Sequence, residues 1–274
     1  MDPLTQGVLG TTASQLVSKP SQKVTAAILG FLSGMAADLD VLIRSSHDPL
    51  FSLEYHRHFT HALVFIPFGA LICTFVFYAF LTKFAKTERL RLSFKAVYLF
   101  CFVGYATHAL LDACTTYGTQ LLWPFSNARI AWNNVSVIDP LFTVPLLAIV
   151  GLSILKRSRP SSKKLAWLGA IYALTYLSLG VVQNQRAKTI ALELAQSRGH
   201  DVINLGLKPS FANIIVWKSV YQYQDRYYVD AIRVGFNGKV YPGSSTEKLD
   251  TKKHFQWLKL NSQQATDIDR LRWF

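Results

Sequence analysis

Long apolar blocks separated by short polar connections fill most of the chain, whereas its last part mixes polar and apolar positions evenly. The block Ala62–Leu81 carries no charged residue over 20 positions. A helix of about this length crosses the ~30 Å hydrocarbon layer of a bilayer. Four more blocks resemble it: Leu141–Leu155, Leu165–Val182, Phe94–Leu111 with Lys95 at its edge, and Val24–Ile43, which is apolar except for Asp38 and Asp40. The pattern predicts a polytopic transmembrane bundle of about five to six helices, so the fold class is mainly α.

Two segments differ from an ordinary membrane helix. Leu141–Leu155 has only 15 residues, so its flanks must contribute to the span or the bilayer must thin locally. Pro3–Val17 is less apolar and favours a partly inserted or re-entrant helix. The start of the chain shows no basic leader with a short apolar core and a small-residue cleavage site, so we expect the first helix to be retained.

From Arg186 the sequence resembles a small soluble domain. Ala187–Gly199 has the pattern of an amphipathic helix that ends at its glycine. Asn213–Phe236 alternates polar and apolar residues, with Gln224–Arg226 as a turn between two strands. Thr246–Leu260 indicates another short helix. We therefore predict a transmembrane helical domain over residues 1–185 and a small α+β domain over residues 186–274.

The formal net charge of +13 is concentrated in alternate connections between the apolar blocks. Twelve basic residues occupy one set: Lys19, Lys23, Lys83, Lys86, Arg89, Arg91, Lys95, Lys156, Arg157, Arg159, Lys163 and Lys164. The other set carries only Arg44, Arg57 and Arg129. Positive loops stay in the cytoplasm, so the charge records topology and we expect no nucleic-acid partner. The same rule places the C-terminal domain outside the cytoplasm, covering the polar residues described next.

With this orientation, the acidic and histidine residues of the apolar region fall at the non-cytoplasmic end of their helices. They are Asp38, Asp40, His56, His58, His61, His108, Asp112 and Asp139. A charge inside a membrane costs roughly 2.5–3.5 kcal/mol, so an unneeded one is disfavoured there. A divalent metal would neutralise the carboxylates and give the histidines a partner. Cys73, Cys101 and Cys114 are too scattered for a disulfide framework and favour buried small hydrophobes.

The spacing within each motif bears on ligation. His108 and Asp112 are four residues apart and share a helix face, although such pairs also serve as caps or structural pairs. Asp38 and Asp40 point apart by about 200° on a regular helix. On a regular helix, one of them could ligate a metal while the other acts as a base or supports a ligand. This restriction is lifted if the helix unwinds. The alternative is that the two aspartates only mark the end of a helix.

The motif "HRHFTH" adds three histidines and an arginine. His58 and His61 could share a face, whereas His56 needs the loop to fold back; interfacial histidines at headgroup depth are the alternative. Mixed histidine and aspartate ligation suits zinc or another divalent transition metal. Arg57 could clamp an anionic phosphate or meet lipid headgroups. Asp139 precedes a proline at a helix start, where capping and ligation are both open.

At these residues the chain resembles the bacterial YdjM-type membrane-bound metal-dependent hydrolases, also described as LexA-binding, inner membrane-associated hydrolases. The shared pieces come in the family's order: "MDPLTQGVLG", "AADLDVL", "YHRHFTHAL", "THALLDACTTYGTQLLWPFS" and "VIDPLFT". The resemblance implies a helical protein of the bacterial inner membrane with a divalent-metal site. It implies as ligands Asp38, Asp40, His56, His61, His108 and Asp112. Gln6 stands where relatives carry histidine, and His58 stands where relatives often carry glycine.

These patterns favour a membrane-embedded, metal-dependent hydrolase that acts on a lipid-linked substrate at the non-cytoplasmic leaflet. Asp38 or Asp40 would take the proton of the attacking water, and Arg57 would steady an anionic group. A metal or proton transporter is the rival hypothesis, but it needs polar residues continuing toward the cytoplasm. The segments Leu63–Leu81 and Ala96–Val103 offer little beyond Thr74, Tyr78 and Tyr98. A non-catalytic stress-response protein with a structural metal is a further alternative.

Overall fold

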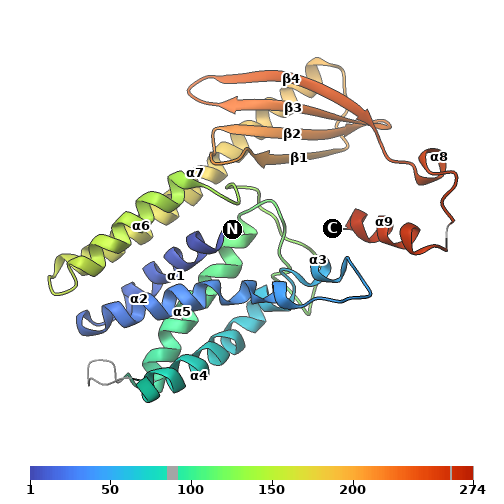
Figure 1. The fold of residues 1–274 in the computed structure, drawn as a ribbon. Coiled ribbons are helices and arrows are strands. Elements are labelled where there is room, and N and C mark those ends of the chain that lie inside the picture. Colours follow the sequence, from blue (N-terminus) through green and yellow to red (C-terminus); the bar gives the residue numbers. More distant parts are fainter. Residues whose placement is uncertain (85–91, 260, 274) are drawn as a thin grey trace.

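The computed structural model describes residues 1–84, 92–259 and 261–273. Its first part is a helical bundle, and its last part is a small antiparallel sheet with short helices (Figure 1). The bundle helices are α1 (Pro3–Val17), α2 (Lys23–Met35), α4 (Ile66–Phe84), α5 (Phe94–Ala113), α6 (Pro140–Leu155) and α7 (Ser161–Ser197). The mainly α fold class with a C-terminal α+β region is therefore confirmed.

Four helical segments of the described chain are long and apolar enough to cross a membrane. They are Pro20–Leu42, Leu63–Lys83, Phe94–Ala113 and Ser161–Ser197. Helix α6 is apolar but shorter, as its 15-residue block predicts. These helices expose large apolar side chains, as a lipid-facing surface requires. Phe75, Val76 and Leu174, for example, are 60–67% exposed. The cysteines are free and buried, as expected.

Helix α1 lies inside the bundle, where it packs against α2, α5, α6 and α7. Its mild hydropathy follows from this position, because it contacts protein on all these sides and has little need of a lipid-facing apolar surface. Small residues allow the close approach of α2. A Cβ atom on Gly10 would lie 2.3 Å from the carbonyl oxygen of Gly30, so a side chain there would separate the two helices.

Between α2 and α4 the chain makes a series of short helical turns. The 3₁₀ helix η1 (Pro20–Gln22) precedes α2, and η2 (Ala36–Leu42) follows it. Helix α3 (Phe51–Tyr55) and the turns η3 (Phe59–His61) and η4 (Leu63–Phe65) then lead into α4. The predicted apolar block Val24–Ile43 therefore changes from α to 3₁₀ geometry where its two aspartates stand.

The bundle has two chemically different ends. The start of α2, the end of α4 and the α6–α7 connection lie at one end, and α3 and the sheet lie toward the other (Figure 1). Lys23, Lys83 and Lys156 belong to the first end. Lys86, Arg89 and Arg91, which contributed to the predicted topology, lie outside the described residues.

Helix α7 continues without a break through the predicted domain boundary at residues 185–186. The predicted membrane helix and the predicted amphipathic helix are thus one helix of 37 residues, which ends before Gly199 (φ +70°). Ala187 and Ala191 on its extension share a core with Trp217 and Ile232 of the sheet. The extension of α7 therefore supports the C-terminal sheet.

The sheet has four antiparallel strands in sequential order. They are β1 (Asn204–Pro209), β2 (Val216–Tyr223), β3 (Arg226–Val234) and β4 (Gly238–Glu247). The predicted turn at Gln224–Arg226 joins β2 to β3. Helices α8 (Thr251–His254) and α9 (Gln263–Trp273) follow. Arg270 of α9 forms ion pairs with Asp48 and Glu54, which connects the end of the chain to the α3 region.

Candidate metal centre

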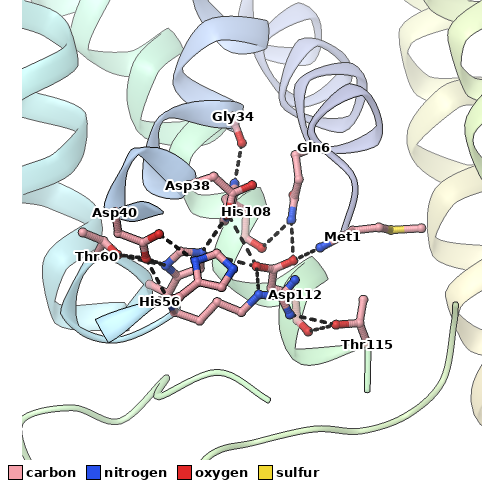
Figure 2. Close-up of polar contacts among 12 residues, drawn as sticks. Met1, Gln6, Gly34, Asp38, Asp40, His56, Thr60, His108, Asp112 and Thr115 are labelled. Atoms are coloured by element: carbon pink, nitrogen blue, oxygen red, sulfur yellow. Dashed lines mark hydrogen bonds and ion pairs between the residues drawn. The ribbon is translucent and has the colours of Figure 1, made fainter. Parts of the chain in front are cut away.

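Four side-chain atoms from three separate parts of the chain converge at one point between η2, η3 and α5. They are Asp38 Oδ1, His61 Nε2, His108 Nε2 and Asp112 Oδ2. The two imidazole nitrogens lie 2.9 Å apart. The carboxylate oxygens lie 3.3–3.5 Å from these nitrogens. Figure 2 shows the carboxylates of Asp38 and Asp112 directed toward the imidazoles.

These separations match the edges of a small coordination tetrahedron. Ligands at ~2.0–2.1 Å from a central zinc ion lie about 3.3–3.4 Å from one another. The five separations span 2.9–3.5 Å. Asp112 Oδ2 is buried, forms an ion-pair contact of 3.0 Å with Arg57 Nε and lies 3.3–3.5 Å from both imidazole Nε2 atoms. The donor set fits a bound divalent cation.

Both imidazoles are held so that Nε2 faces the cluster. His108 Nδ1 lies 2.6 Å from the carbonyl oxygen of Gly34, so it donates its proton to that oxygen. His61 Nδ1 lies 2.9 Å from Thr60 Oγ1 and 3.3 Å from Asp40 Oδ2. In the neutral tautomers that these contacts select, two Nε2 lone pairs face each other, and a cation between them relieves their repulsion.

Asp40 supports the cluster from the other side of His61. Its carboxylate oxygens contact His56 Nδ1 at 2.8 Å, the backbone N–H of Arg57 at 2.9 Å and the Thr60 hydroxyl at 2.9 Å. Because η2 is a 3₁₀ helix, Asp38 and Asp40 reach opposite nitrogens of the single His61 imidazole. The two carboxylates of the "DLD" motif thus take different positions, as the unwound helix allows.

The other oxygen of Asp112 is bound by the first residues of the chain. Asp112 Oδ1 accepts a hydrogen bond from Gln6 Nε2 at 2.7 Å and also contacts the amino nitrogen of Met1 (Figure 2). Gln6 is fully buried, and its Oε1 has no partner among the described residues. The first helix therefore reaches the cluster through Asp112.

Arg57 is buried beside the cluster with a backbone conformation unusual for an arginine. Its φ of +61° lies in the left-handed region, which costs free energy outside glycine. The surrounding contacts fix it, because its N–H binds Asp40 and its carbonyl accepts from Gln120 N at 3.1 Å. Arg57 Nη1 donates to Thr115 Oγ1 at 3.0 Å, and Nε forms an ion-pair contact of 3.0 Å with Asp112 Oδ2.

The carboxylates strongly favour positive charge on His61. Burial alone lowers the pKa of His61, but hydrogen bonds and charges from Asp112, Asp38 and Asp40 outweigh it and raise the pKa to about 10. A proton and a metal ion compete for the same nitrogen, because an imidazole must be neutral to ligate. The negative charge of the carboxylates therefore favours either a proton on His61 or a bound metal ion.

The sequence left the roles of His58 and Asp139 open, and both residues lie outside the four-atom cluster. His58 packs its ring against Tyr55 and Trp123, with centroids 5.3 and 5.5 Å away. Asp139 caps α6, accepting from Leu141 N at 3.1 Å, and receives the Tyr176 hydroxyl at 2.8 Å. Among the described residues, neither belongs to a group with metal-ligand spacing.

A second group shares one member with the cluster. Ligand atoms of Asp38, Asp40 and His56 all lie within 4.8 Å of one another. The six predicted ligands are therefore brought into one neighbourhood. Sequence reasoning missed Thr60 and Thr115, because hydroxyls that support a neighbouring charged group follow no spacing rule along the chain.

Comparison with known proteins identifies a family for the helical part of the chain. The family described as YdjM inner membrane protein matches residues 1–187, which include every residue of the cluster and exclude the sheet. The protein described as "Uncharacterized protein YfhP" of Bacillus subtilis (strain 168) is 24% identical over 159 residues, covering 56% of this chain and 46% of its own length.

"Inner membrane protein YbcI" of Escherichia coli (strain K12) is 31% identical over 112 residues, covering 39% of this chain and 60% of its own length. The chain thus spans about half the length of the curated relatives it matches. No solved structure gives a significant match. The family match and the four apolar helices support a multi-pass protein of the inner membrane.

Proposed function

This chain belongs to the YdjM inner membrane protein family, and we propose that it is a membrane-embedded, metal-dependent hydrolase. The observation that carries the proposal is the convergence of Asp38, His61, His108 and Asp112, whose ligand atoms all lie within 4.8 Å of one another. Zinc is the proposed metal, because two imidazoles with carboxylates are typical zinc ligands.

The four donors differ in exposure, and this difference suggests their roles. The side chains of His61, His108 and Asp112 are fully buried, whereas that of Asp38 is 20% exposed. Catalytic zinc sites use three protein ligands and leave one position for water or substrate. We assign the three buried residues to hold the metal and Asp38 to the accessible side, where its carboxylate can take a proton.

A divalent metal held there would lower the pKa of a bound water toward ~7 and polarise the bond under attack. The chain's own residues orient the ligands around it. Asp40 and Thr60 hold the His61 imidazole, and the Gly34 carbonyl holds that of His108. Arg57 keeps Nε at Asp112 and Nη1 at Thr115, which places its guanidinium where it can steady an anionic group.

The proposed substrate is a lipid-linked molecule at the non-cytoplasmic leaflet, with a phosphoester as the bond that is cleaved. Two observations support this depth. The membrane-capable segment Pro20–Leu42 ends next to Asp38 and Asp40, and Leu63–Lys83 begins two residues after His61. The asymmetry of basic residues supports an orientation in which this end of the bundle, and the C-terminal sheet with it, lies outside the cytoplasm.

One observation favours the transporter alternative. Helix α1 buries a polar face that begins at Gln6 beside Asp112 and continues to Ser14 and Gln15. Both polar side-chain atoms of Gln15 lack a partner among the described residues. The Ser14 hydroxyl, in contrast, donates to the carbonyl of Phe100 at 2.9 Å and is satisfied within the protein. Because the satisfied Ser14 hydroxyl interrupts this polar face, the face is a poor path for an ion, and hydrolysis is the better supported function.

Metal analysis and hydrolysis assays on the purified protein test the proposal together. We expect bound zinc in the wild type, loss of zinc in His108→Ala and Asp112→Ala, and loss of turnover of lipid phosphoesters with it. Bound metal without turnover on any lipid, ester or phosphoester would favour a structural metal. Metal flux across proteoliposomes that depends on Gln15 would favour transport.

A further inference from the structure

A surface cavity of about 360 Å³ lies beside the candidate metal centre. The residues that line it are Val41, Arg44, Ser52, Leu53, His56 and Tyr117. Three of these carry polar or charged groups of use to an anion: the guanidinium of Arg44, the imidazole of His56 and the hydroxyl of Ser52. The remaining walls are apolar or aromatic, which is the usual composition of a small-molecule site.

His56 connects this cavity to the metal centre. Its Nδ1 is 2.8 Å from Asp40 Oδ1, and its ring centroid is 6.1 Å from that of His61. A ligand atom of His56 also lies within 4.8 Å of one from Asp38. A molecule in the cavity is thus one side chain away from the accessible carboxylate of the centre.

Three arginines lie in or beside the cavity. Tyr117 forms one wall, and the guanidinium carbons of Arg57 and Arg129 lie 4.7 and 5.9 Å from its ring centroid. Arg44 is exposed and donates Nε to the carbonyl of Val41 at 3.0 Å. No carboxylate of the described chain forms an ion pair with Arg44, so its terminal nitrogens are available to an anion.

Exposed apolar side chains precede Arg44 in the chain. Leu39, Val41 and Leu42 of η2 are 63%, 42% and 70% exposed, and the membrane-capable segment ends at Leu42. Arg44 follows two residues after the end of that segment, where a lipid headgroup is expected if the segment spans the membrane. An anion with an attached acyl or isoprenoid chain satisfies both surfaces at once, whereas a free anion leaves the apolar one uncovered.

We propose that this cavity binds the phosphate-bearing headgroup of a membrane lipid, with Arg44 as the residue that recognises the phosphate. The inference rests on the proposed function for the identity of the bond that is cleaved, but binding itself requires no metal. Ser52 and Tyr117 shape the space, and the exposed apolar side chains of η2 accompany the lipid chain.

Native mass spectrometry of the full chain in detergent, with a chelator present, measures this binding without turnover. The probes are dioleoylphosphatidylglycerol, dioleoylglycerol, which lacks the phosphate, and inorganic phosphate. Arg44→Ala is expected to weaken phosphatidylglycerol binding at least about tenfold, as loss of a charge-assisted hydrogen bond does. Ser52→Trp fills the cavity without removing the charge and is expected to have a similar effect.

Arg233→Ala is the matched control, because Arg233 is an exposed arginine of the sheet; its binding is expected to stay within about twofold of wild type. Zinc retained by Arg44→Ala in a separate preparation without chelator shows that the centre is folded. Unchanged binding in Arg44→Ala or Ser52→Trp overturns the inference, even if the protein hydrolyses lipids.

The other two probes test what the cavity recognises. If dioleoylglycerol binds as tightly as dioleoylphosphatidylglycerol, phosphate recognition is excluded. If inorganic phosphate binds as tightly, a lipid site is excluded. Binding as expected without hydrolysis on any substrate contradicts the proposed function and leaves the cavity assignment intact.

Discussion

Asp230 in the sheet and Asp112 in the bundle are both buried carboxylates, but the protein satisfies them to different degrees. Asp230 receives two hydrogen bonds from Arg198, at 2.8 and 2.9 Å, and a third from the backbone N–H of Gly243 at 2.9 Å. Asp112 uses one oxygen for Gln6 and Met1, while the other forms an ion-pair contact with Arg57 Nε at 3.0 Å and faces two imidazoles.

The comparison shows how a structural ion pair differs from a candidate metal ligand. A buried carboxylate is tolerated when fixed donors satisfy both oxygens, as around Asp230. Asp112 also has fixed donors in Gln6 and Arg57, but its Oδ2 additionally faces two imidazole nitrogens that are candidate ligand atoms. The family match covers residues 1–187 and so includes Asp112 but not Asp230.

The largest expected effect is the loss of metal in Asp112→Asn. The amide keeps the shape of the side chain but removes the charge and places an N–H group among ligand atoms. We expect zinc affinity to fall by more than about a hundredfold, beyond the loss typical of residues that only orient a ligand. Zinc titration followed by a competing chelator measures this affinity.

Asp230→Asn is the matched control for this substitution, because it makes the same chemical change in the other buried carboxylate. Its zinc affinity is expected to equal that of wild type. Equal loss of zinc in both variants would mean that the loss reports general unfolding rather than ligation.

A smaller effect is expected for Asp40→Asn. Asp40 contacts His61 Nδ1 rather than the ligating Nε2, so it orients a ligand without replacing one. Residues in that position typically contribute about 10–100-fold to metal affinity. The same chelator competition tests this, and an effect as large as that of Asp112→Asn would indicate that Asp40 itself binds the metal.

For the sheet, Asp230→Asn is expected to cost stability instead of metal. Loss of the charge-assisted bonds to Arg198 should lower the free energy of local unfolding by about 1.5–3 kcal/mol. Hydrogen exchange of the β3 amides in the full chain measures this change. Unaltered exchange in β3 would show that the ion pair contributes little to the fold.

The smallest expected effect is the pH dependence of that contribution. Burial alone raises the pKa of Asp230, but the Arg198 guanidinium and the Gly243 N–H outweigh it and lower the pKa below its ordinary value. A lowered folded-state pKa stabilises the sheet above the unfolded value of about 4, and this stabilisation is lost as pH falls below it. The protection of the β3 amides, measured relative to their intrinsic exchange rates at each pH, should therefore fall with acid in wild type more than in Asp230→Asn. An equal response in both would assign the acid sensitivity to other groups.

Much of the bundle could be predicted from the sequence, because uncharged apolar runs such as Ala62–Leu81 have few alternatives to a membrane helix. The same reasoning favoured a partly inserted or re-entrant helix for α1. In the structure α1 lies among other helices, and this interior position makes a long apolar surface unnecessary. It also divided α7 at residues 185–186, because composition changes there from lipid-facing to solvent-facing while the backbone continues as a helix.

The candidate site was predicted as a set of residues but not as an arrangement. Spacing indicated that His108 and Asp112 share a helix face, which the structure confirms through their common contact with His61. It could not indicate the 3₁₀ geometry of η2, which sends Asp38 and Asp40 to opposite sides of one imidazole. Nor could it indicate Thr60 or the Gly34 carbonyl, which orient the histidines from loops and backbone.

X-ray absorption spectroscopy of the zinc-loaded wild-type protein tests the central claim most directly. The account predicts a single shell of nitrogen and oxygen ligands at ~2.0–2.1 Å, with the multiple-scattering signature of two imidazoles. Asp112→Asn should lose this spectrum. A sulfur shell at ~2.3 Å, or zinc that remains bound with an unchanged spectrum in Asp112→Asn, would contradict it.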